Sequence, residues 1–423
     1  MNWIATFTFI MCAGFSYVIS KKKITPFFVF SLVWGVIMFC ECLHLFGLNQ
    51  SHSLTYCVIF LGVLSFGIGS MICRRVVFKH ACHSFYLDKR LFIILSILTI
   101  SFMMYPALTN VVAMSNGLTD FIEIRKEFSN IYSNIVLALI YNYIAQPFAM
   151  ACLPIFSAIV FCDRYQKREK VLFFIFVTII IFEKILIDAG RGIIIYFLIM
   201  MFFSYKMFVK KGQGIQLKRR MKKLLVCMGT VAILAYVGIT IARGSSFSFL
   251  PRQIYVYICG CVPFLDSCIE SVKESGQYLY GTGGLHGVIQ LVFTMLDNVG
   301  LVSYPDFVIK SDELYNATLI ARNIGEYLYF NAYASAFYNF YIDGGIVAVI
   351  IEMLIYGGAS RCIYNHVCRE EENYRIKAIY IFVLYSLFFS FIRFQFSLAK
   401  NVIVCILIFL IIRKRNINES CSN

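Results

Sequence analysis

Apolar stretches of membrane-spanning length recur along the whole of this 423-residue chain. A helix needs about 20 mostly apolar residues to cross the roughly 30 Å hydrocarbon core of a bilayer. We count eleven such stretches, the last of them short: 2–20, 24–48, 54–73, 91–112, 136–162, 171–188, 192–209, 224–241, 345–362, 378–392 and 401–412. Only 14% of the residues are charged, against about 25% in soluble domains, which excludes a soluble enzyme and a disordered chain. We therefore predict an all-α, polytopic integral membrane protein with about eleven (ten to twelve) transmembrane helices.

Basic residues set the orientation that we expect for these spans. With eleven spans, the strongly basic connections all fall on one side, among them 74–90, 164–170 and 210–223. Cytoplasmic loops carry an excess of Lys and Arg, so we place the N-terminus outside and the C-terminus inside. In this topology 26 of the 38 basic residues lie in inner loops. The net charge of +15 then comes almost wholly from the cytoplasmic loops, and no nucleic-acid partner is expected.

One outer segment, 242–344, is about a hundred residues long, far beyond the usual connection. We predict that it forms a large periplasmic loop domain that carries the function. The chain then divides into 1–241 with eight transmembrane helices, 242–344, and 345–423 with the last helices and a cytoplasmic tail. Two interrupted apolar stretches of the loop, 254–265 and 285–302, are predicted to be helices that lie at the membrane interface or enter it partway.

Motifs for metals and nucleotides are missing from the sequence. The nearest approach to a metal site lacks a second ligand pair at zinc-finger spacing; it comprises Cys73, His80, Cys82 and His83. The outer segment contains three cysteines, Cys259, Cys261 and Cys268. The sequence leaves open whether two of them form a disulfide bond. The glycine-rich stretch 281–287 has no P-loop Lys-Ser/Thr after it and is predicted to be a turn. We expect no cofactor and no metal, so an enzyme of this kind would act through electrostatics and a side-chain base.

Several arginines lie on the predicted outer side, which is otherwise mildly acidic. The preference of basic residues for cytoplasmic loops does not explain their position. Arg191 lies in a tight turn, Asp188-Ala-Gly-Arg-Gly, between two spans, where a charge is often functional. The alternatives for Arg191 are a side chain that reaches the interface or a local pair with Asp188. Arg243 and Arg252 follow the eighth span, and their planar guanidinium groups are suited to phosphate oxygens. The alternative for this pair is ordinary flanking of a membrane span.

The end of the outer segment is dominated by aromatic residues. Asn331, Tyr333 and Tyr341 belong to a stretch, 321–345, that also contains Arg322, Glu326 and Asp343. Aromatic faces pack against sugar rings, and amides and carboxylates bond sugar hydroxyls. The same residues would also serve as an aromatic belt at the membrane interface. A sugar site and a belt are equally compatible with this pattern.

Three of these features together resemble the bacterial O-antigen polymerases, the Wzy-type repeat-unit polymerases. The first is the Gly-Arg-Gly turn at 190–192 leading into a span, and the second is Arg243-Gly244 at the opening of the outer segment. The third, FNAYASAFYNFYIDGGIV at 330–347, is similar to the family's Asn-x-Tyr/Thr … Tyr-x-Asp-x-Gly stretch. Gly344 stands where the family often has an aromatic residue. The resemblance extends over most of the chain through the layout of the spans.

The resemblance implies a glycosyltransferase of the bacterial inner membrane with its active site facing the periplasm. Such an enzyme transfers a growing glycan from polyprenyl diphosphate to the non-reducing end of a lipid-linked repeat unit. Its implied partners are the lipid-linked oligosaccharide, membrane lipid, a chain-length regulator and a flippase. Two alternatives stay open: an O-antigen ligase, and, from another class, a lipid-linked oligosaccharide flippase. The large outer loop and the outer arginines favour transfer over transport.

Glycosyl transfer of this kind gives the candidate residues their expected roles. The leaving diphosphate needs cationic stabilisation, for which the outer arginines are Arg191, Arg243, Arg252 and Arg322. A base must take the proton of the acceptor hydroxyl, and four candidates remain unranked: Asp343, Glu326, His286 and Asp188. Asn331, Tyr333 and Tyr341 are the expected sugar contacts.

Overall fold

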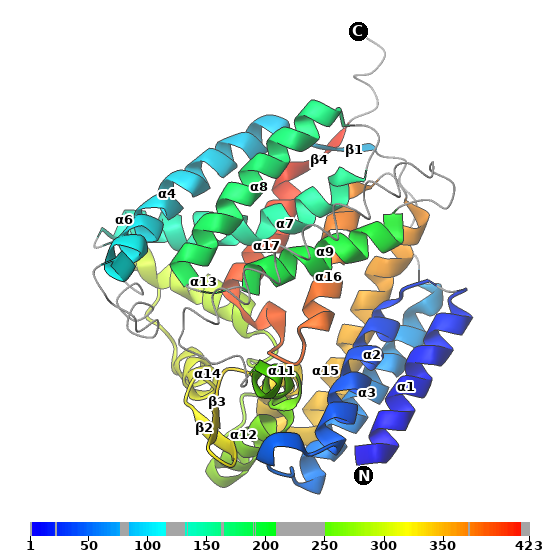
Figure 1. The fold of residues 1–423 in the computed structure, drawn as a ribbon. Coiled ribbons are helices and arrows are strands. Elements are labelled where there is room, and N and C mark those ends of the chain that lie inside the picture. The colour runs from blue at the N-terminus through cyan, green and yellow to red at the C-terminus, as the bar shows by residue number, and fades with distance from the viewer. Residues whose placement is uncertain are drawn as a thin grey trace. The chain divides into compact units, whose positions relative to one another are not determined.

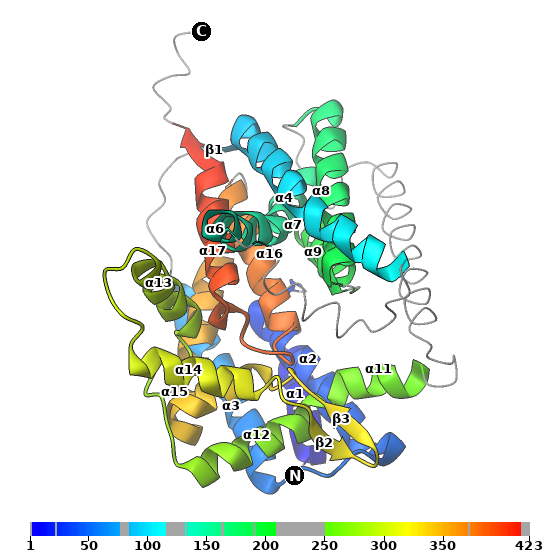
Figure 2. The ribbon, with the colours of Figure 1, turned by 90° about the vertical axis from the view of Figure 1, so that its left-hand side faces the viewer.

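The chain forms two compact, predominantly helical units (Figures 1 and 2). The computed structural model describes residues 2–21, 23–76, 84–115, 132, 134–161, 165–188, 190, 192–208, 250–370 and 373–415. Unit 1 comprises Met1–Lys79, Ser248–Arg369 and Ser386–Val402; unit 2 comprises His80–Phe247, Glu370–Tyr385 and Ile403–Asn423. The predicted span at 224–241 lies outside the described residues. Elsewhere a helix coincides with each predicted apolar stretch, so the all-α class is confirmed.

Unit 1 joins helices from distant parts of the sequence. Its helices are α1 (Asn2–Ile19), α2 (Pro26–Cys42), α3 (Ser53–Ile72), α11 (Leu250–Cys259), α12 (Cys261–Ser275), α13 (His286–Asn298), α14 (Asp306–Ala317) and α15 (Ser335–Arg369). A small antiparallel hairpin, β2 (Arg322–Gly325) and β3 (Leu328–Phe330), lies between α14 and α15 in the sequence. The predicted outer segment therefore contains helices at both of its interrupted apolar stretches.

Unit 2 is built mainly from the middle of the chain. Its elements are α4 (Lys89–Ser115), α6 (Ile135–Ile140), a π-turn at Tyr141–Ala145, α7 (Gln146–Val160), α8 (Lys167–Asp188), α9 (Gly192–Phe208), and the antiparallel strands β1 (Ser84–Leu87) and β4 (Ile412–Arg415). Helices α16 (Tyr374–Phe388) and α17 (Ala399–Ile411) each have residues in both units.

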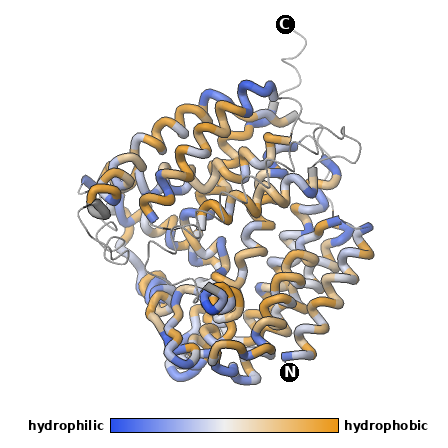
Figure 3. The backbone as a smooth tube through the Cα atoms, in the orientation of Figure 1, coloured by the Kyte–Doolittle hydropathy of each residue, from blue (hydrophilic) through white to orange (hydrophobic). Residues whose placement is uncertain are grey.

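Several of these helices have the length and composition of membrane spans. Five helices among the described residues are long and apolar enough to cross a membrane: Asn2–Ile19, Ser53–Arg75, Lys89–Val112, Val136–Val160 and Ser335–Arg369. Helices α11 and α12 together form a sixth apolar segment, bent by 45°. Apolar residues dominate α1, α2 and α3 along their length (Figure 3). The chain is thus a helical protein suited to a membrane.

Glycines let α3 and α15 approach each other at backbone distance (Figure 1). Gly69 lies against the carbonyl of Leu354, and Gly357 lies against the carbonyl of Phe66. Neither glycine has room for a Cβ atom. Small residues are the usual means of close helix packing in membranes, where lipid tails are as apolar as the side chains.

Buried aromatic rings fill the space beside this helix pair. Phe30 and Phe66 stack with ring centroids 4.4 Å apart, and Trp34 lies 4.6 Å from Phe337. The Trp34 indole N–H donates to the Ser390 hydroxyl at 3.0 Å. Each of these rings is almost fully buried, and the indole keeps the hydrogen bond that a buried tryptophan needs. The core thereby fixes the first half of α15 against α2 and α3.

Helix α15 is interrupted at the glycine pair 344–345. The second glycine has φ 66° and ψ −145°, a conformation that residues with a Cβ rarely adopt. The carbonyls of Ile342 and Asp343, which the break frees, accept the main-chain N–H groups of Leu279 and Tyr280 at 2.8 and 3.1 Å. The segment that precedes α13 therefore caps the first half of α15.

Candidate functional site

Asp343 is held by the main chain of a glycine-rich turn. Its side chain is 4% exposed, and its two carboxylate oxygens accept the N–H groups of Gly283 and Gly284, each at 2.7 Å. The turn lies within 281–287, as the sequence predicts. Hydrogen bonds to a charged acceptor are about twice as strong as neutral ones. They fasten the turn to the last residue of α15 before its break.

A second carboxyl, which the sequence analysis did not select, lies beside Asp343. Glu352 belongs to α15 beyond the break and is partly exposed, and its carboxyl and that of Asp343 both lie within contact distance of the position that a Cβ at Gly284 would take. The Glu352 carboxyl occupies the space that a Cβ at Gly284 would need. We name Asp343 and Glu352 the carboxyl pair. The available sequence signal was an acidic residue inside an apolar span, a type that is often functional.

His286 is the centre of a buried polar network between α13 and α14. Its Nδ1 lies 2.8 Å from the Ser311 hydroxyl, and its Nε2 lies 3.3 Å from the Asp312 carboxylate. Asp312 also accepts hydrogen bonds from Gln290 and Tyr304. His286 is 2% exposed, so both ring nitrogens are engaged with neighbouring side chains. The arrangement is that of a residue that joins two helices.

The His286 network predicts a pH dependence of stability. Burial lowers the pKa of His286, and Asp312 opposes that shift only in part. Since the unfolded histidine has a pKa of about 6.5, the unfolded chain binds more protons than the folded one in this range. The stability contribution is therefore complete above about pH 6.5 and is lost as the pH falls. We expect the melting temperature of purified protein to drop on acidification, and to drop less in His286→Gln. Parallel melting curves for the two proteins would contradict this assignment.

A small cavity, with room for about one water molecule, lies where α14, the start of α15 and the segment before α17 meet, and we name it the arginine pocket. Its lining residues are Tyr315, Thr318, Ala332, Ala334, Tyr338, Asn339, Ile392 and Arg393. The Arg393 guanidinium lies 5.2 Å from the centre of the Tyr315 ring, and the His286 ring stacks on that tyrosine, also at 5.2 Å. Asn339 accepts the main-chain N–H of Phe394 at 3.2 Å. The pocket thus places one cation among two tyrosines and an amide.

Arg393 was not selected by the sequence analysis. It stands between the predicted spans 378–392 and 401–412, a connection that the predicted topology places outside. The argument that drew attention to the other outer arginines applies equally to it.

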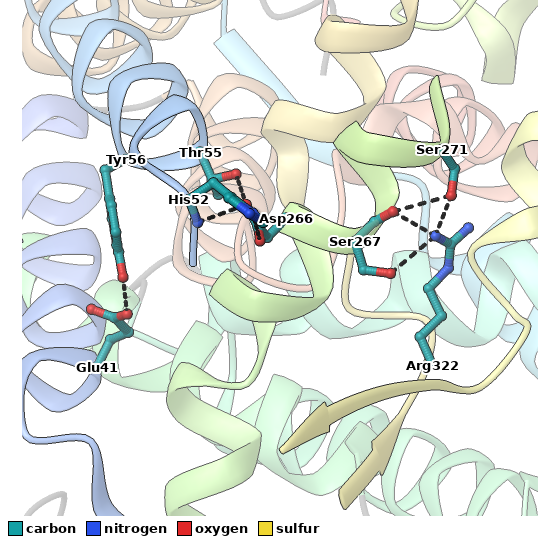
Figure 4. Close-up of polar contacts among 8 residues, drawn as sticks. All are labelled: Glu41, His52, Thr55, Tyr56, Asp266, Ser267, Ser271 and Arg322. Atoms are coloured by element: carbon teal, nitrogen blue, oxygen red, sulfur yellow. Dashed lines mark hydrogen bonds and ion pairs between the residues drawn. The ribbon is translucent and has the colours of Figure 1, made fainter. Parts of the chain in front are cut away.

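Two of the predicted cationic groups are engaged in holding the hairpin. Arg252 donates to the main-chain carbonyl of Glu326 at 3.0 Å. Arg322 donates to the carbonyl of Ser267 and to the hydroxyl of Ser271, each at 2.6 Å (Figure 4). Both arginines thereby join β2 and β3 to neighbouring helices. The Glu326 side chain is exposed, and its main-chain N–H donates to Gly47.

The predicted sugar contacts are distributed over different surroundings. Asn331 is exposed and donates to the Leu319 carbonyl at 3.1 Å. Tyr333 packs against Tyr257 and Phe330, with ring centroids 5.9 and 4.8 Å away. Tyr341 is 4% exposed, which places it in the core. Asn331 and Tyr333 are the members that reach the surface.

Asp188 belongs to unit 2, whereas the other candidate bases belong to unit 1. It is exposed and accepts a hydrogen bond from Lys184, one helical turn earlier, at 2.7 Å. Lys184 also donates to Gln146 at 2.6 Å. Arg191 and Arg243 lie outside the described residues, so their predicted role stays a prediction.

Two further polar contacts join helices of unit 1. Glu41 accepts hydrogen bonds from the Tyr56 hydroxyl and from Asn2, which links α2 to α3 and α1. Asp266 of α12 binds the start of α3 through His52 and Thr55 (Figure 4). Each carboxylate is thus satisfied by neighbours within the unit, and both contacts serve helix packing.

No cluster of metal-ligating side chains occurs among the described residues, although His80, Cys82 and His83 lie outside them. Cys259, Cys261 and Cys268 are buried and free, so no disulfide joins them. Comparisons with protein-family models, curated proteins and solved structures found no match for this chain.

Proposed function

We propose that the chain is a membrane glycosyltransferase that polymerises lipid-linked oligosaccharide repeat units. One observation carries the proposal: within unit 1, the 330–347 segment lines part of the arginine pocket, whose cation is Arg393, and contributes Asp343 to the carboxyl pair. Asn339 lines the pocket, and Asp343 lies one helical turn later in the same helix. A cation and a carboxylate are the two groups that transfer from a prenyl diphosphate requires.

The proposed reaction forms one glycosidic bond and breaks one sugar–phosphate bond. A hydroxyl oxygen at the non-reducing end of the acceptor repeat unit attacks C1 of the donor glycan. The bond between C1 and the phosphate oxygen breaks, and its electron pair leaves with the polyprenyl diphosphate. A carboxylate takes the hydroxyl proton. Arginines stabilise the charge that develops on the diphosphate, and Arg's planar fork suits two phosphate oxygens at once.

The predicted topology places this chemistry at the periplasmic face of the inner membrane. With eleven spans and an outside N-terminus, the connections before Gly192, before Leu250 and before Ala399 are all external. Arg191, Arg243 and Arg393 belong to these three connections. The donor and the acceptor, both anchored by prenyl chains, would reach them from the surrounding lipid. A flippase that delivers repeat units and a chain-length regulator are the expected partners.

Deletion of the gene in its own cell tests the class of function. A polymerase deletion leaves lipid A core carrying a single repeat unit, with no ladder of longer chains on a gel. Complete loss of the repeat from the core would instead indicate a ligase or a flippase and would overturn the proposal. Restoration of the ladder by the full chain on a plasmid is the control for secondary mutations.

Replacing the outer arginines is expected to remove chain elongation. We expect Arg191→Ala, Arg243→Ala and Arg393→Ala each to reduce long chains by about 100-fold or more, the loss typical of one electrostatic contact in the transition state. The corresponding Lys variants should also fail, since lysine offers only a point charge. The readout is the gel ladder, normalised to membrane-inserted protein.

Lys310→Ala provides the matched control for these variants. Lys310 is an exposed cation on α14, and its removal is expected to leave the ladder unchanged. A normal ladder from any one arginine variant would remove that residue from the diphosphate site. Equal loss in the Lys310 variant would show that the assay reports overall charge and not the site.

A further inference from the structure

The break in α15 is what brings the carboxyl pair together. Asp343 and Glu352 are nine residues apart, and in an uninterrupted helix they would lie on opposite faces and about 13 Å apart along the axis. Their carboxyls nevertheless both lie within contact distance of the position that a Cβ at Gly284 would take. The non-helical glycine pair 344–345 provides the change of direction that this contact requires.

The glycine-rich turn closes the same site from the other side. Gly283 and Gly284 donate their N–H groups to Asp343, and a side chain at Gly284 would collide with the Glu352 carboxyl. The turn can approach both carboxyls only because it carries no Cβ at this position. The break in α15 and the glycine-rich turn therefore together position the two carboxyls. A helix that only crosses a membrane would need neither feature.

Hydrogen bonding and exposure assign different parts to the two carboxyls. Asp343 already accepts two main-chain N–H groups and is 4% exposed. Glu352 is partly exposed, so it is the member that a hydroxyl can reach.

We propose that Glu352 is the catalytic residue that receives the acceptor proton and that Asp343 is its positioning residue. This inference rests on the proposed function. As the acceptor oxygen attacks C1, its proton moves to the Glu352 carboxylate, which becomes a neutral acid. The leaving diphosphate takes the electron pair of the broken bond. Loss of the proton from Glu352 to water restores the carboxylate.

Elongation by full-length protein in lipid nanodiscs, with purified lipid-linked repeat units, tests this assignment. We expect Glu352→Gln to lower kcat by about 100-fold or more, the contribution of a general base, with KM for the repeat unit within threefold of wild type. Glu352→Asp retains the acid but withdraws it by one methylene, so we expect at least tenfold loss of kcat. Formate should restore part of the activity of Glu352→Ala.

Controls separate the failure of this inference from that of the proposed function. If wild-type protein forms no chains, the proposed function fails. If wild type elongates and a folded Glu352→Gln keeps more than a third of its kcat, the catalytic assignment fails. Should Glu352→Gln not fold, full kcat in Glu352→Asp would overturn it equally. Glu313→Gln, which changes an exposed carboxyl of α14, is expected to retain wild-type kcat and melting temperature.

Discussion

Replacing Gly69 or Gly357 with alanine is expected to remove most of the folded protein. A Cβ at Gly69 would overlap the main-chain carbonyl of Leu354, and a Cβ at Gly357 would overlap that of Phe66. A backbone atom inside a helix cannot turn aside as a side chain can, so α3 and α15 would have to separate. Overpacking of this kind typically costs about 1–3 kcal/mol and sometimes more. Alanine gains only about 1 kcal/mol over glycine in helix propensity, so the collision outweighs the gain.

Thermal unfolding of the detergent-purified variants measures this effect. Gly14→Ala is the matched control, because Gly14 also lies within a helix of unit 1 and has no atom within 4 Å of the added Cβ. It should melt at or slightly above the wild-type temperature. Wild-type melting of Gly69→Ala and Gly357→Ala would show that α3 and α15 are not packed through these glycines.

Asp343→Asn is expected to release the glycine-rich turn and to abolish elongation. Each carboxylate oxygen of Asp343 accepts one main-chain N–H, from Gly283 and from Gly284. An asparagine has one oxygen, and its NH₂ group would face the other N–H donor. A buried donor left without a partner costs about 1–3 kcal/mol. Since Asp343 also positions Glu352, we expect a loss of kcat of about 100-fold under the proposed function.

Hydrogen exchange separates the structural part of this prediction from the catalytic part. Amide exchange in the peptide around 281–287 should accelerate in Asp343→Asn, whereas exchange in α3 should not change. Asp297→Asn, at an exposed position of α13, is the control and should leave both exchange and elongation as in wild type. Unchanged protection of the turn in Asp343→Asn would contradict the anchoring role of the carboxylate.

Helix positions followed from the sequence because they depend on local properties. Length and apolarity over about 20 residues are sufficient to locate a membrane helix, and helices occur at the predicted stretches wherever the structure is described. The predicted span at 345 begins at the break inside α15, and the helical part that precedes the break from Ser335 was not predicted. The aromatic residues before the break occur on every side of the helix, so they gave no amphipathic signal, and the glycine pair resembled a boundary.

Contacts between distant segments account for what the sequence did not predict at the site. Asp343 was among the candidate bases, and 281–287 was predicted to be a turn, but nothing local links them. Glu352 and Arg393 were not among the residues selected from the sequence. The role that we assign to each residue depends on a contact with a residue at least nine positions away in the sequence. A sequence pattern can show which residues are unusual, whereas tertiary packing determines which of them lie side by side.

The order of the segments in unit 1 determines when it can be completed during synthesis. Helix α3 is made early, but its partner α15 begins only at Ser335, and unit 1 also needs residues from Ser386–Val402. At about 5–20 residues per second, the ribosome takes roughly 10 to 50 s to travel from the end of α3 to the start of α15. During that interval the glycine face of α3 has only lipid, or a helper protein of the insertion machinery, to cover it. Assembly of this unit is therefore a late event of biogenesis, and truncations that end before α15 leave α3 without its main partner.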